Sequence, residues 1–325
     1  MKQTLLALAG AGLIAWSACS TEQAGPQGDT SEVPSGPTSA AFGNRRTTDR
    51  FATTRGELVV SPLEHASVLF GWDGRAIYVD PTTTAVEDKH LPKADVVFVT
   101  EDRLDHLDPV AIERLRQAGT VVVGPAAAAS RTPLDVVMRN GDARLVAGIQ
   151  VTAVPMYSLA RGPGPGLLYH DKGRGNGYVL GFGGVRVYLS GDTECTPEME
   201  ALDRIGVAFI SVHEPQTMTE AEAIRCVEAF RPRVVFPYHD RRVDLTSLSR
   251  ALSADGIDVR VRELSPRPER WRRDAVTACA EGQWGICRDR LELARLLDPA
   301  GESDPRVVAA REQVRAWQSP FPPWW

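Results

Sequence analysis

Residues 101–108 of this 325-residue chain concentrate side chains that can bind a cation or transfer a proton. Asp105 and His106 stand side by side, and each can offer a lone pair to a divalent metal ion. Arg103 cannot, because its guanidinium stays protonated and carries no free lone pair. A divalent metal bound here would lower the pKa of a bound water molecule. The resulting hydroxide could attack an ester or a phosphate near neutral pH. The residue types therefore predict metal-assisted hydrolysis, with Arg103 available to stabilise negative charge.

The flanking residues predict a strand before this segment and a helix after it. Residues 94–100 form a short apolar run rich in β-branched side chains, which is typical of a buried strand. Asp108 and Pro109 are typical of a helix N-terminus, because aspartate accepts from free backbone N–H groups and proline lacks an N–H that the first turn leaves unused. Strand ends that lead into helices are where α/β folds place binding sites. As an alternative, Asp105 and a second aspartate, Asp192, serve only as helix caps.

The same segment resembles the H-x-H-x-D-H signature of the metallo-β-lactamase superfamily, which reads T-H-D-H-x-D-H-L-D in its ascorbate-6-phosphate lactonase-like branch. Glu101 and Arg103 replace the two leading histidines, whereas Asp105 and His106 keep their places. Further segments resemble the same branch in the same order, namely residues 65–81, 151–158, 173–180, 185–194 and 237–239. The resemblance implies a metallo-β-lactamase-like domain over residues 47–264, folded as an αββα sandwich.

The resemblance also implies which residues bind metal. In relatives with a complete site, the two leading histidines and a third histidine bind the first metal, and Ser158 stands at that third position here. The first site is therefore dismantled. The second site is complete, and its ligands are Asp105, His106, Asp192 and His239. Two carboxylates and two imidazoles suit one zinc ion, with iron or manganese as alternatives.

Two functions remain open on the sequence alone. The first is a metal-dependent hydrolase with a single metal at the second site, acting on a small-molecule ester, lactone or phosphodiester. Asp105 or Asp192 would then accept a proton, and Arg103 would stabilise the charge that develops. The second is a catalytically inactive binding protein without a metal, whose Arg103 pocket recognises an anionic ligand. Glu101 is either the ion-pair partner of Arg103 or an oxygen ligand.

Three further histidines have two interpretations each. His65, His170 and His213 lie at strand ends or in loops whose surroundings resemble this branch. They either contact the substrate and the metal ligands, or they are ordinary hydrogen-bonded strand and loop residues. If His65 or His170 filled in for the lost ligands, the first metal site would be rebuilt.

The rest of the main domain alternates between helix and strand. Residues 197–205, 219–230 and 245–254 are predicted helices, and residues 207–213, 234–238 and 257–264 are predicted strands. Thr219, with Glu222 three residues further on, predicts a capping box at a helix N-terminus. The dipeptide Asp73-Gly74, between two apolar runs, predicts a hairpin turn.

Beyond residue 264 the pattern changes to helices alone. Residues 271–281, 284–297 and 305–317 are predicted helices, and pieces of this region resemble one tetratricopeptide-like hairpin. A single hairpin of this kind cannot bury its own apolar face, so it packs on the main domain or on a protein partner. Residues 265–325 thus form a small helical appendage that ends in an aromatic tail, residues 321–325.

The N-terminus resembles a bacterial lipoprotein signal. Residues 1–19 combine Lys2, an apolar run too short to span a bilayer, and the sequence Ser-Ala-Cys that ends at Cys19. Residues 20–46 are rich in Ser, Thr, Gly and Pro and are predicted to be a disordered tether. We expect export to the bacterial cell envelope and membrane attachment through a lipid on Cys19, with secretion as the alternative.

The remaining four cysteines show no C-x-x-C spacing of a structural zinc site. Cys195 and Cys226 could form a disulfide in an oxidising compartment, although we favour free buried thiols for this pair. Cys279 and Cys287 are either bridged or free.

The composition is ordinary for a globular protein, with 43% hydrophobic and 24% charged residues. The net charge of -5 argues against nucleic acid as a partner, because phosphate backbones require a basic surface. No stretch of residues 47–325 is long and apolar enough to span a membrane.

Overall fold

The computed structural model describes residues 48–87, 90–239 and 244–318. The predicted signal segment with Cys19, the predicted tether over residues 20–46 and the aromatic tail over residues 321–325 lie outside the described residues. Among the residues that are described, no helix is both long and apolar enough to cross a membrane.

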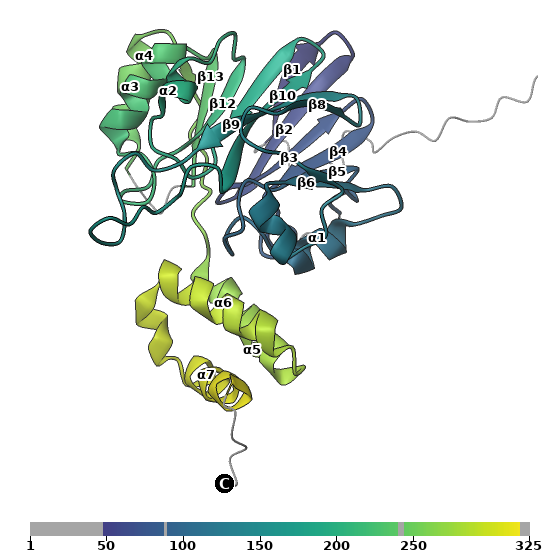
Figure 1. Ribbon diagram of the computed structural model, residues 1–325, viewed down its shortest axis with the longest axis vertical. Helices are drawn as coiled ribbons and strands as arrows, with labels where there is room; N and C mark the ends of the chain where they lie inside the picture. Colours follow the sequence, from purple (N-terminus) through teal and green to yellow (C-terminus); the bar gives the residue numbers. More distant parts are fainter. Residues whose placement is uncertain (1–47, 88–89, 240–243, 319–325) are drawn as a thin grey trace, which may run out of the picture. The chain divides into compact units, whose positions relative to one another are not determined.

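Two seven-stranded mixed sheets face each other in the described part of the chain (Figure 1). The first sheet comprises β1(Asp49–Thr53), β2(Gly56–Glu64), β3(Ser67–Trp72), β4(Arg75–Val79), β5(Val96–Phe98), β6(Val121–Gly124) and β7(Val136–Val137), in that order. The second sheet comprises β8(Ala143–Val146), β9(Ile149–Met156), β10(Gly175–Phe182), β11(Val185–Leu189), β12(Val207–Ser211), β13(Val234–Tyr238) and β14(Asp258–Val259). Neighbouring strands are antiparallel from β1 to β4 and from β8 to β11, and parallel from β4 to β7 and from β11 to β14.

Apolar side chains from both sheets fill the space between them. On β3, Phe70 points into this inter-sheet core and Leu69 points to the outer face of the sheet, because side chains alternate along a strand. Phe70 meets Phe209 of β12 in an edge-to-face contact, with 6.0 Å between the ring centroids. Strands such as β3 and β12 are buried on both faces, which explains why they appear in the sequence as continuous apolar runs.

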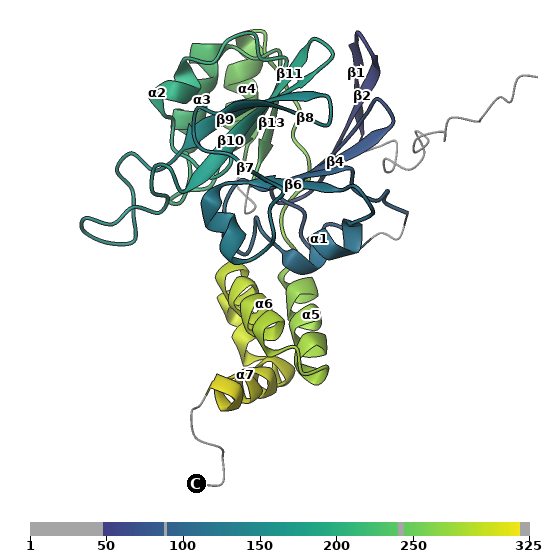
Figure 2. The same cartoon turned by 45° about the vertical axis from the view of Figure 1, so that its right-hand side comes forward.

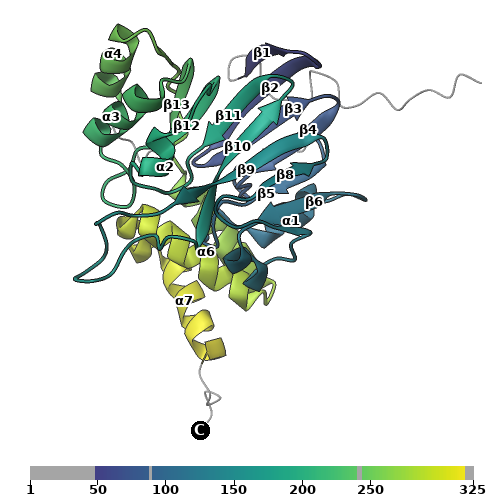
Figure 3. The same ribbon diagram turned by 45° about the horizontal axis from the view of Figure 1, so that its top comes forward.

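Helices cover the outer faces of the two sheets (Figure 3). On the first sheet, α1(Pro109–Leu115) packs with Ile112 and Leu115, and the 3-10 helix η2(Ala126–Ser130) packs with Ala128. On the second sheet, α2(Pro197–Glu200), α3(Glu220–Phe230) and α4(Thr246–Ala254) bury Met199 and Leu248 among other apolar residues. The predicted αββα sandwich is therefore confirmed.

Two local signals in the sequence are found as predicted. Asp73 and Gly74 form the β3–β4 turn with φ values of 51° and 71°, the left-handed conformation that a two-residue hairpin turn needs. Thr219 caps α3: its side chain accepts from the N–H of Glu222, and its own N–H donates to the Glu222 carboxylate over 2.9 Å. The turn and the helix cap each depend only on residues a few positions apart, so the sequence alone could predict them.

The last predicted strand of the second sheet is shorter than expected. Residues 257–264 pair with β13 only over Asp258–Val259. The Arg260 N–H still donates to the Val235 carbonyl of β13 over 2.8 Å, while the side chains of Arg260 and Arg262 bind Asp49 on β1, with N–O distances of 2.8 and 2.7 Å. The rest of the segment leaves β13, and the Leu264 carbonyl accepts from the His65 N–H over 2.7 Å.

Three α-helices follow the sandwich within the described residues: α5(Pro268–Ala280), α6(Trp284–Leu297) and α7(Pro305–Gln318), with a 3-10 helix, η3(Pro299–Ser303), before the last (Figure 2). They share an apolar cluster of their own, and they also pack on the main domain. Leu293 of α6 packs against the cluster that includes Leu104, and buried Arg290 donates to Thr83 Oγ1 over 2.9 Å. The helices therefore cover part of the sandwich, while the tetratricopeptide resemblance stays a prediction.

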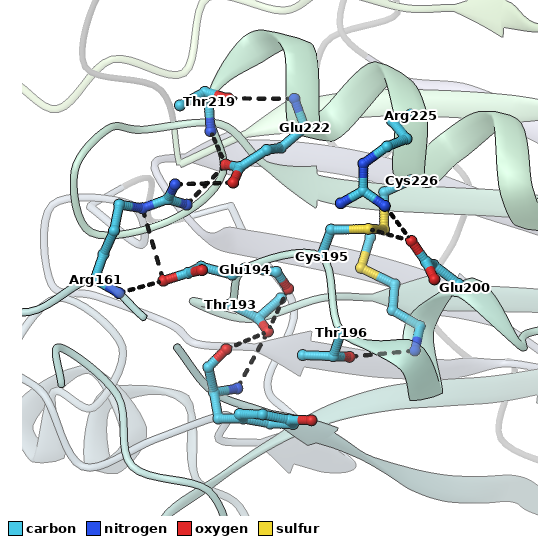
Figure 4. The surroundings of a disulfide bond; sticks show 12 residues. Arg161, Thr193, Glu194, Cys195, Thr196, Glu200, Thr219, Glu222, Arg225 and Cys226 are labelled. Atoms are coloured by element: carbon cyan, nitrogen blue, oxygen red, sulfur yellow. Dashed lines mark hydrogen bonds and ion pairs between the residues drawn. A yellow bond between two sulfur atoms is a disulfide. The ribbon is translucent and has the colours of Figure 1, made fainter. Parts of the chain in front are cut away.

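The four described cysteines form two disulfides. Cys195 is bonded to Cys226 of α3, with 5.7 Å between the Cα atoms, and Cys279 is bonded to Cys287 across the α5–α6 turn. The expectation of free thiols at Cys195 and Cys226 is wrong, because the loop after β11 runs directly beside α3 (Figure 4). Arg161 strengthens the same junction, since its guanidinium binds the Glu222 carboxylate over 2.7 and 2.9 Å.

Candidate metal centre

The ionisable side chains gather where strands of both sheets end. Asp80 follows β4, residues 101–108 follow β5, Asp192 follows β11 and His239 follows β13. The carboxyl ends of parallel strands lie at one edge of a sheet, so each sheet presents its part of this group at one edge. The N–H of His239 donates to the carbonyl of His65 over 3.3 Å and so joins the two edges.

Three of these residues have unusual backbone conformations. Asp80, His65 and His239 have φ values of 44°, 56° and 55°, in the left-handed region that residues other than glycine seldom adopt. Each comes directly after a strand, namely β4, β2 and β13. Conformations of this kind concentrate at functional sites, where the surrounding fold holds a side chain in a required direction.

On one side of the cluster, imidazoles and carboxylates approach one another closely. His239 Nε2 lies 3.2 Å from Asp192 Oδ2 and 3.7 Å from Asp105 Oδ2. His65 Nε2 lies 3.3 Å from the same Asp105 oxygen. The rings of His65 and His239 are in contact and tilted by 40°, with 3.9 Å between their centroids.

On the other side, Glu101 takes the place of the imidazole that the family signature would supply. His106 Nε2 lies 3.4 Å from Asp192 Oδ1 and 3.7 Å from Glu101 Oε1. His170 Nδ1 lies 3.4 Å from Glu101 Oε2, and its Nε2 lies 3.8 Å from Asp192 Oδ2. Asp192 therefore stands between the two sides and contacts a histidine on each.

The atoms that face the centre have the spacing of metal ligands. Glu101 Oε1, His106 Nε2 and Asp192 Oδ1 are buried and accept or donate no hydrogen bond among the described residues, and one ligand atom from each lies within 4.8 Å of the others. His65, Asp105, His106 and His239 form a second group within the same limit. Ligand atoms bound about 2 Å from a tetrahedral zinc lie roughly 3.3 Å from one another. The observed separations fit a divalent cation, which would satisfy these buried atoms at once.

Asp192 and Asp105 remain ionised at neutral pH. Burial raises the pKa of Asp192, but the nearby His239 and His106 outweigh burial and hold that pKa well below its ordinary value. Burial acts in the same way on Asp105, and hydrogen bonding to His239 and His65 likewise holds its pKa well below the ordinary value. Both side chains are therefore anions that can bind a cation.

The two histidines on either side of Asp192 differ in charge. Burial lowers the pKa of His239 to about 3, despite the opposing attraction of Asp192, so this ring is neutral and keeps a lone pair. For His106, burial is outweighed by the carboxylates of Asp192 and Asp80, which hold the pKa well above the ordinary value. Without a metal, a proton on His106 supplies positive charge where a bound cation would supply it.

His106 is oriented by a residue that the sequence analysis did not assign to the site. Its Nδ1 donates to Asp80 Oδ2 over 2.8 Å, and Asp80 is fixed in turn by the hydroxyl and the N–H of Thr100 over 2.6 and 2.8 Å. Because the carboxylate holds Nδ1–H, Nε2 is the atom that faces the centre. The only signal in the sequence was an aspartate directly after a predicted hairpin.

We expect Asp80→Asn to weaken metal binding by roughly 10- to 100-fold, the usual cost of losing a partner that orients a metal-binding histidine. Zinc affinity in competition with a chromogenic chelator measures this effect. Asp95→Asn is the matched control, because Asp95 also accepts a backbone N–H in the first sheet, over 2.8 Å, but contacts no residue of the centre. Equal zinc affinities of the Asp80 variant and the unaltered protein would show that this contact does not support the centre.

The structure brings the four predicted ligands Asp105, His106, Asp192 and His239 close together, since His106 belongs to both ligand groups and Asp192 contacts His106 and His239. His65 and His170, for which the sequence left two interpretations, contact Asp105 and Asp192. Ser158 is buried beside this cluster and holds the His170 segment, since its N–H donates to the His170 carbonyl and its hydroxyl accepts from the His170 N–H. The ring of His213 lies next to that of His239, with 5.7 Å between the centroids.

Arg103 and Glu101 do not pair as the sequence suggested. Glu101 contacts His106 and His170 instead, and Arg103 forms no ion pair within 4.0 Å among the described residues. Burial lowers the pKa of Arg103, but the negative charges of Glu101 and Asp105 outweigh it, so the guanidinium stays charged. The Glu101 side chain therefore lies in the centre, whereas the Arg103 side chain lines the cavity beside it.

A cavity of about 460 Å³ opens beside the centre. Its lining includes Glu101, Arg103, Asp105 and His170 from the centre, and Leu104, Arg131, Met156, Tyr169, Arg174, Leu293 and Leu296 around them. The cavity is large enough for a small molecule whose reacting group reaches the carboxylates and imidazoles.

A sandwich of two mixed sheets covered by helices, with a histidine and carboxylate cluster at their joined edges, defines the metallo-β-lactamase class. The β-lactamase superfamily domain model matches residues 60–239, more than half of the chain. Together with the relatives below, this match places the chain in the β-lactamase superfamily and, within it, among the UPF0173 metal-dependent hydrolases. The family resemblance found in the sequence is thus confirmed.

Relatives match most of their own length. A UPF0173 metal-dependent hydrolase of Archaeoglobus fulgidus is 29% identical over 219 residues, which cover 63% of this chain and 94% of the relative. One from Pelotomaculum thermopropionicum is 30% identical over 191 residues, covering 55% and 83%. A solved structure from Parabacteroides distasonis is 36% identical with a TM-score of 0.64, and the match covers 67% of this chain and 99% of that one.

Proposed function

We propose that this protein hydrolyses a small-molecule ester, lactone or phosphodiester with one divalent metal ion held by Asp105, His106, Asp192 and His239. The observation that carries the proposal is a set of buried ligand atoms at spacings suited to a cation, of which His106 Nε2, Asp192 Oδ1 and His239 Nε2 have no hydrogen-bond partner among the described residues. Zinc fits a mixed histidine and carboxylate set, and iron or manganese are alternatives. The bound ion would supply an acidified water as the nucleophile.

The protein's own residues would provide the remaining chemistry. Asp105 lines the cavity as an ionised carboxylate and can accept a proton from the attacking water. Arg103 lines the same cavity with a permanent positive charge and can stabilise an oxyanion or phosphate oxygen as negative charge develops. Asp192 links the two halves of the centre and keeps His106 and His239 in place.

A second candidate function is an inactive binding protein that recognises an anion through Arg103. One observation favours it: the centre can balance its charges without a metal, because a protonated His106 lies between the carboxylates of Asp192 and Asp80. Such a protein would retain the cavity and the fold, but it would bind no metal and hydrolyse nothing.

Metal content and hydrolysis decide between these functions. Protein purified without chelators is analysed by mass spectrometry for metals and then assayed against a panel of esters, lactones and phosphodiesters. We expect about one zinc, iron or manganese ion per chain, and hydrolysis that a chelator abolishes and the same ion restores. If the folded protein takes up none of these ions and hydrolyses no compound, the hydrolase proposal is wrong and the inactive binding protein is the remaining candidate.

Replacing Arg103 tests its proposed role directly. We expect Arg103→Gln to keep its metal but to lose roughly 10²- to 10³-fold in kcat/KM for a phosphodiester such as bis(p-nitrophenyl) phosphate, the usual cost of losing a donor to developing charge. Arg174→Gln is the control, since Arg174 also lines the cavity but is bound to Asp102 over 2.7 Å. If both variants matched the unaltered protein in kcat/KM, Arg103 would have no part in the reaction.

A further inference from the structure

We propose that helix α6 forms one wall of the substrate pocket and selects anionic esters that carry an apolar substituent. This inference rests on the proposed function and specifies its substrate class. Two residues of α6, Leu293 and Leu296, line the same cavity as Arg103 and His170. They stand three positions apart and so lie on one face of the helix, where Leu293 is buried in the apolar cluster and Leu296 is exposed.

This wall is an addition to the family fold. The family model ends its match at residue 239, whereas α6 begins at Trp284. The structure from Parabacteroides distasonis is matched over 99% of its length by only 67% of this chain. The fold that the family shares is therefore complete without α6, and the contribution of this helix to the pocket is particular to chains that carry such an appendage.

The helix is held against the centre by specific contacts. Asp289 of α6 binds Arg131 over 2.5 Å, and Arg290 binds Thr83 over 2.9 Å. Leu104, which lies in the chain between Arg103 and Asp105, packs against the apolar cluster of Leu293. The loop that carries the ionisable residues therefore rests directly on α6, so that the wall and the centre are positioned together.

The charges around the cavity define what can bind. Arg131 and Arg174 form ion pairs with Asp289 and Asp102, whereas Arg103 forms none within 4.0 Å among the described residues and shares the cavity with the carboxylates of Glu101, Asp105 and Asp171. A divalent cation bound at the centre would offset the negative charge of its carboxylates, and Arg103 beside an apolar wall would then favour a ligand with one negative charge and a neighbouring alkyl or aryl group. A phosphodiester with an apolar substituent has both features and contains a bond that the proposed reaction can cleave.

Binding of simple dialkyl phosphates tests this substrate class. Dimethyl, diethyl and dibutyl phosphate carry the same charge and differ only in apolar length, and their affinity for the metal-loaded full chain is measured by isothermal titration calorimetry. We expect the affinity to rise with chain length, by up to about fourfold for each methylene that becomes fully buried. Leu296→Gln should remove most of this dependence on chain length. Arg103→Gln should weaken the binding of all three.

Leu296 suits this test because its side chain is 48% exposed, so its replacement leaves the packed cluster intact. Val308→Gln on α7 is the matched control, since Val308 is 44% exposed and is absent from the cavity lining. An affinity independent of chain length, or a Leu296 variant with the full dependence, would overturn the inference, as would a lack of binding by every phosphate. Metal content and ester hydrolysis are measured separately, so these results leave the proposed hydrolase standing, whereas absence of both metal and hydrolysis refutes the hydrolase itself.

Discussion

Asp192→Ala should abolish metal binding and hydrolysis together. Asp192 contacts His106 through Oδ1 at 3.4 Å and His239 through Oδ2 at 3.2 Å, so its loss removes a ligand and separates the two remaining groups of ligands. We expect the metal content to fall from about one ion per chain to none. Hydrolysis should fall by more than about 100-fold, since even the loss of a residue that only orients a ligand costs roughly 10- to 100-fold.

Mass spectrometry of the purified variant measures the metal, and far-UV circular dichroism shows that it is folded. Asp203→Ala serves as the control, because Asp203 is an exposed aspartate in the same half of the domain that pairs with Arg186. It should keep both metal and activity. An Asp192 variant that retained its ion would mean that the remaining residues form the centre by themselves, and the assignment of Asp192 would be wrong.

Removing the Cys195–Cys226 disulfide should be the most destabilising change outside the centre. The bond joins residues 31 positions apart, and closing a loop of that length in the unfolded chain stabilises the folded state by about 3–4 kcal/mol. Replacing both cysteines with alanine should lower the free energy of unfolding by about this amount. Denaturant unfolding of the purified variant in a non-reducing buffer measures the loss.

The second disulfide supplies an internal comparison. Cys279 and Cys287 are only eight positions apart, so their replacement by alanine should cost less, about 2–3 kcal/mol. Both pairs are compared at the same pH and metal content. If the unaltered protein unfolded at the same denaturant concentration with and without a reducing agent, neither bond would contribute to stability in the way argued here.

Features that depend on neighbouring residues could be predicted from the sequence. The Asp73-Gly74 turn, the Thr219 capping box and the strand before residue 101 each follow from a few adjacent positions. The family signature, which fixes the order of its ligands along the chain, predicted Asp105, His106, Asp192 and His239 as ligands, and the structure brings these residues close together. Their convergence in space agrees with that signature.

Features that depend on distant contacts could not be predicted. Asp80 approaches the centre from its own loop, and an aspartate at that position does not differ from an ordinary loop residue until the fold brings it close to His106. The disulfide at Cys195 depends on the path of one loop past α3. The strand predicted over residues 257–264 is shorter than expected, and contacts with distant residues hold its remainder, since Arg260 and Arg262 bind Asp49 of the other sheet.

The placement of α6 beside the centre has a consequence for the evolution of substrate preference. The proposed ligands lie near positions 105, 192 and 239, whereas two residues of the apolar wall lie near position 295. Leu296 is exposed and lies outside the cluster that packs on Leu104, so mutations at this position need not disturb the ionisable loop. Substrate preference can diversify through substitutions on the helix while the chemistry is inherited unchanged, and recombination that exchanges the C-terminal segment between relatives would transfer a preference in one step.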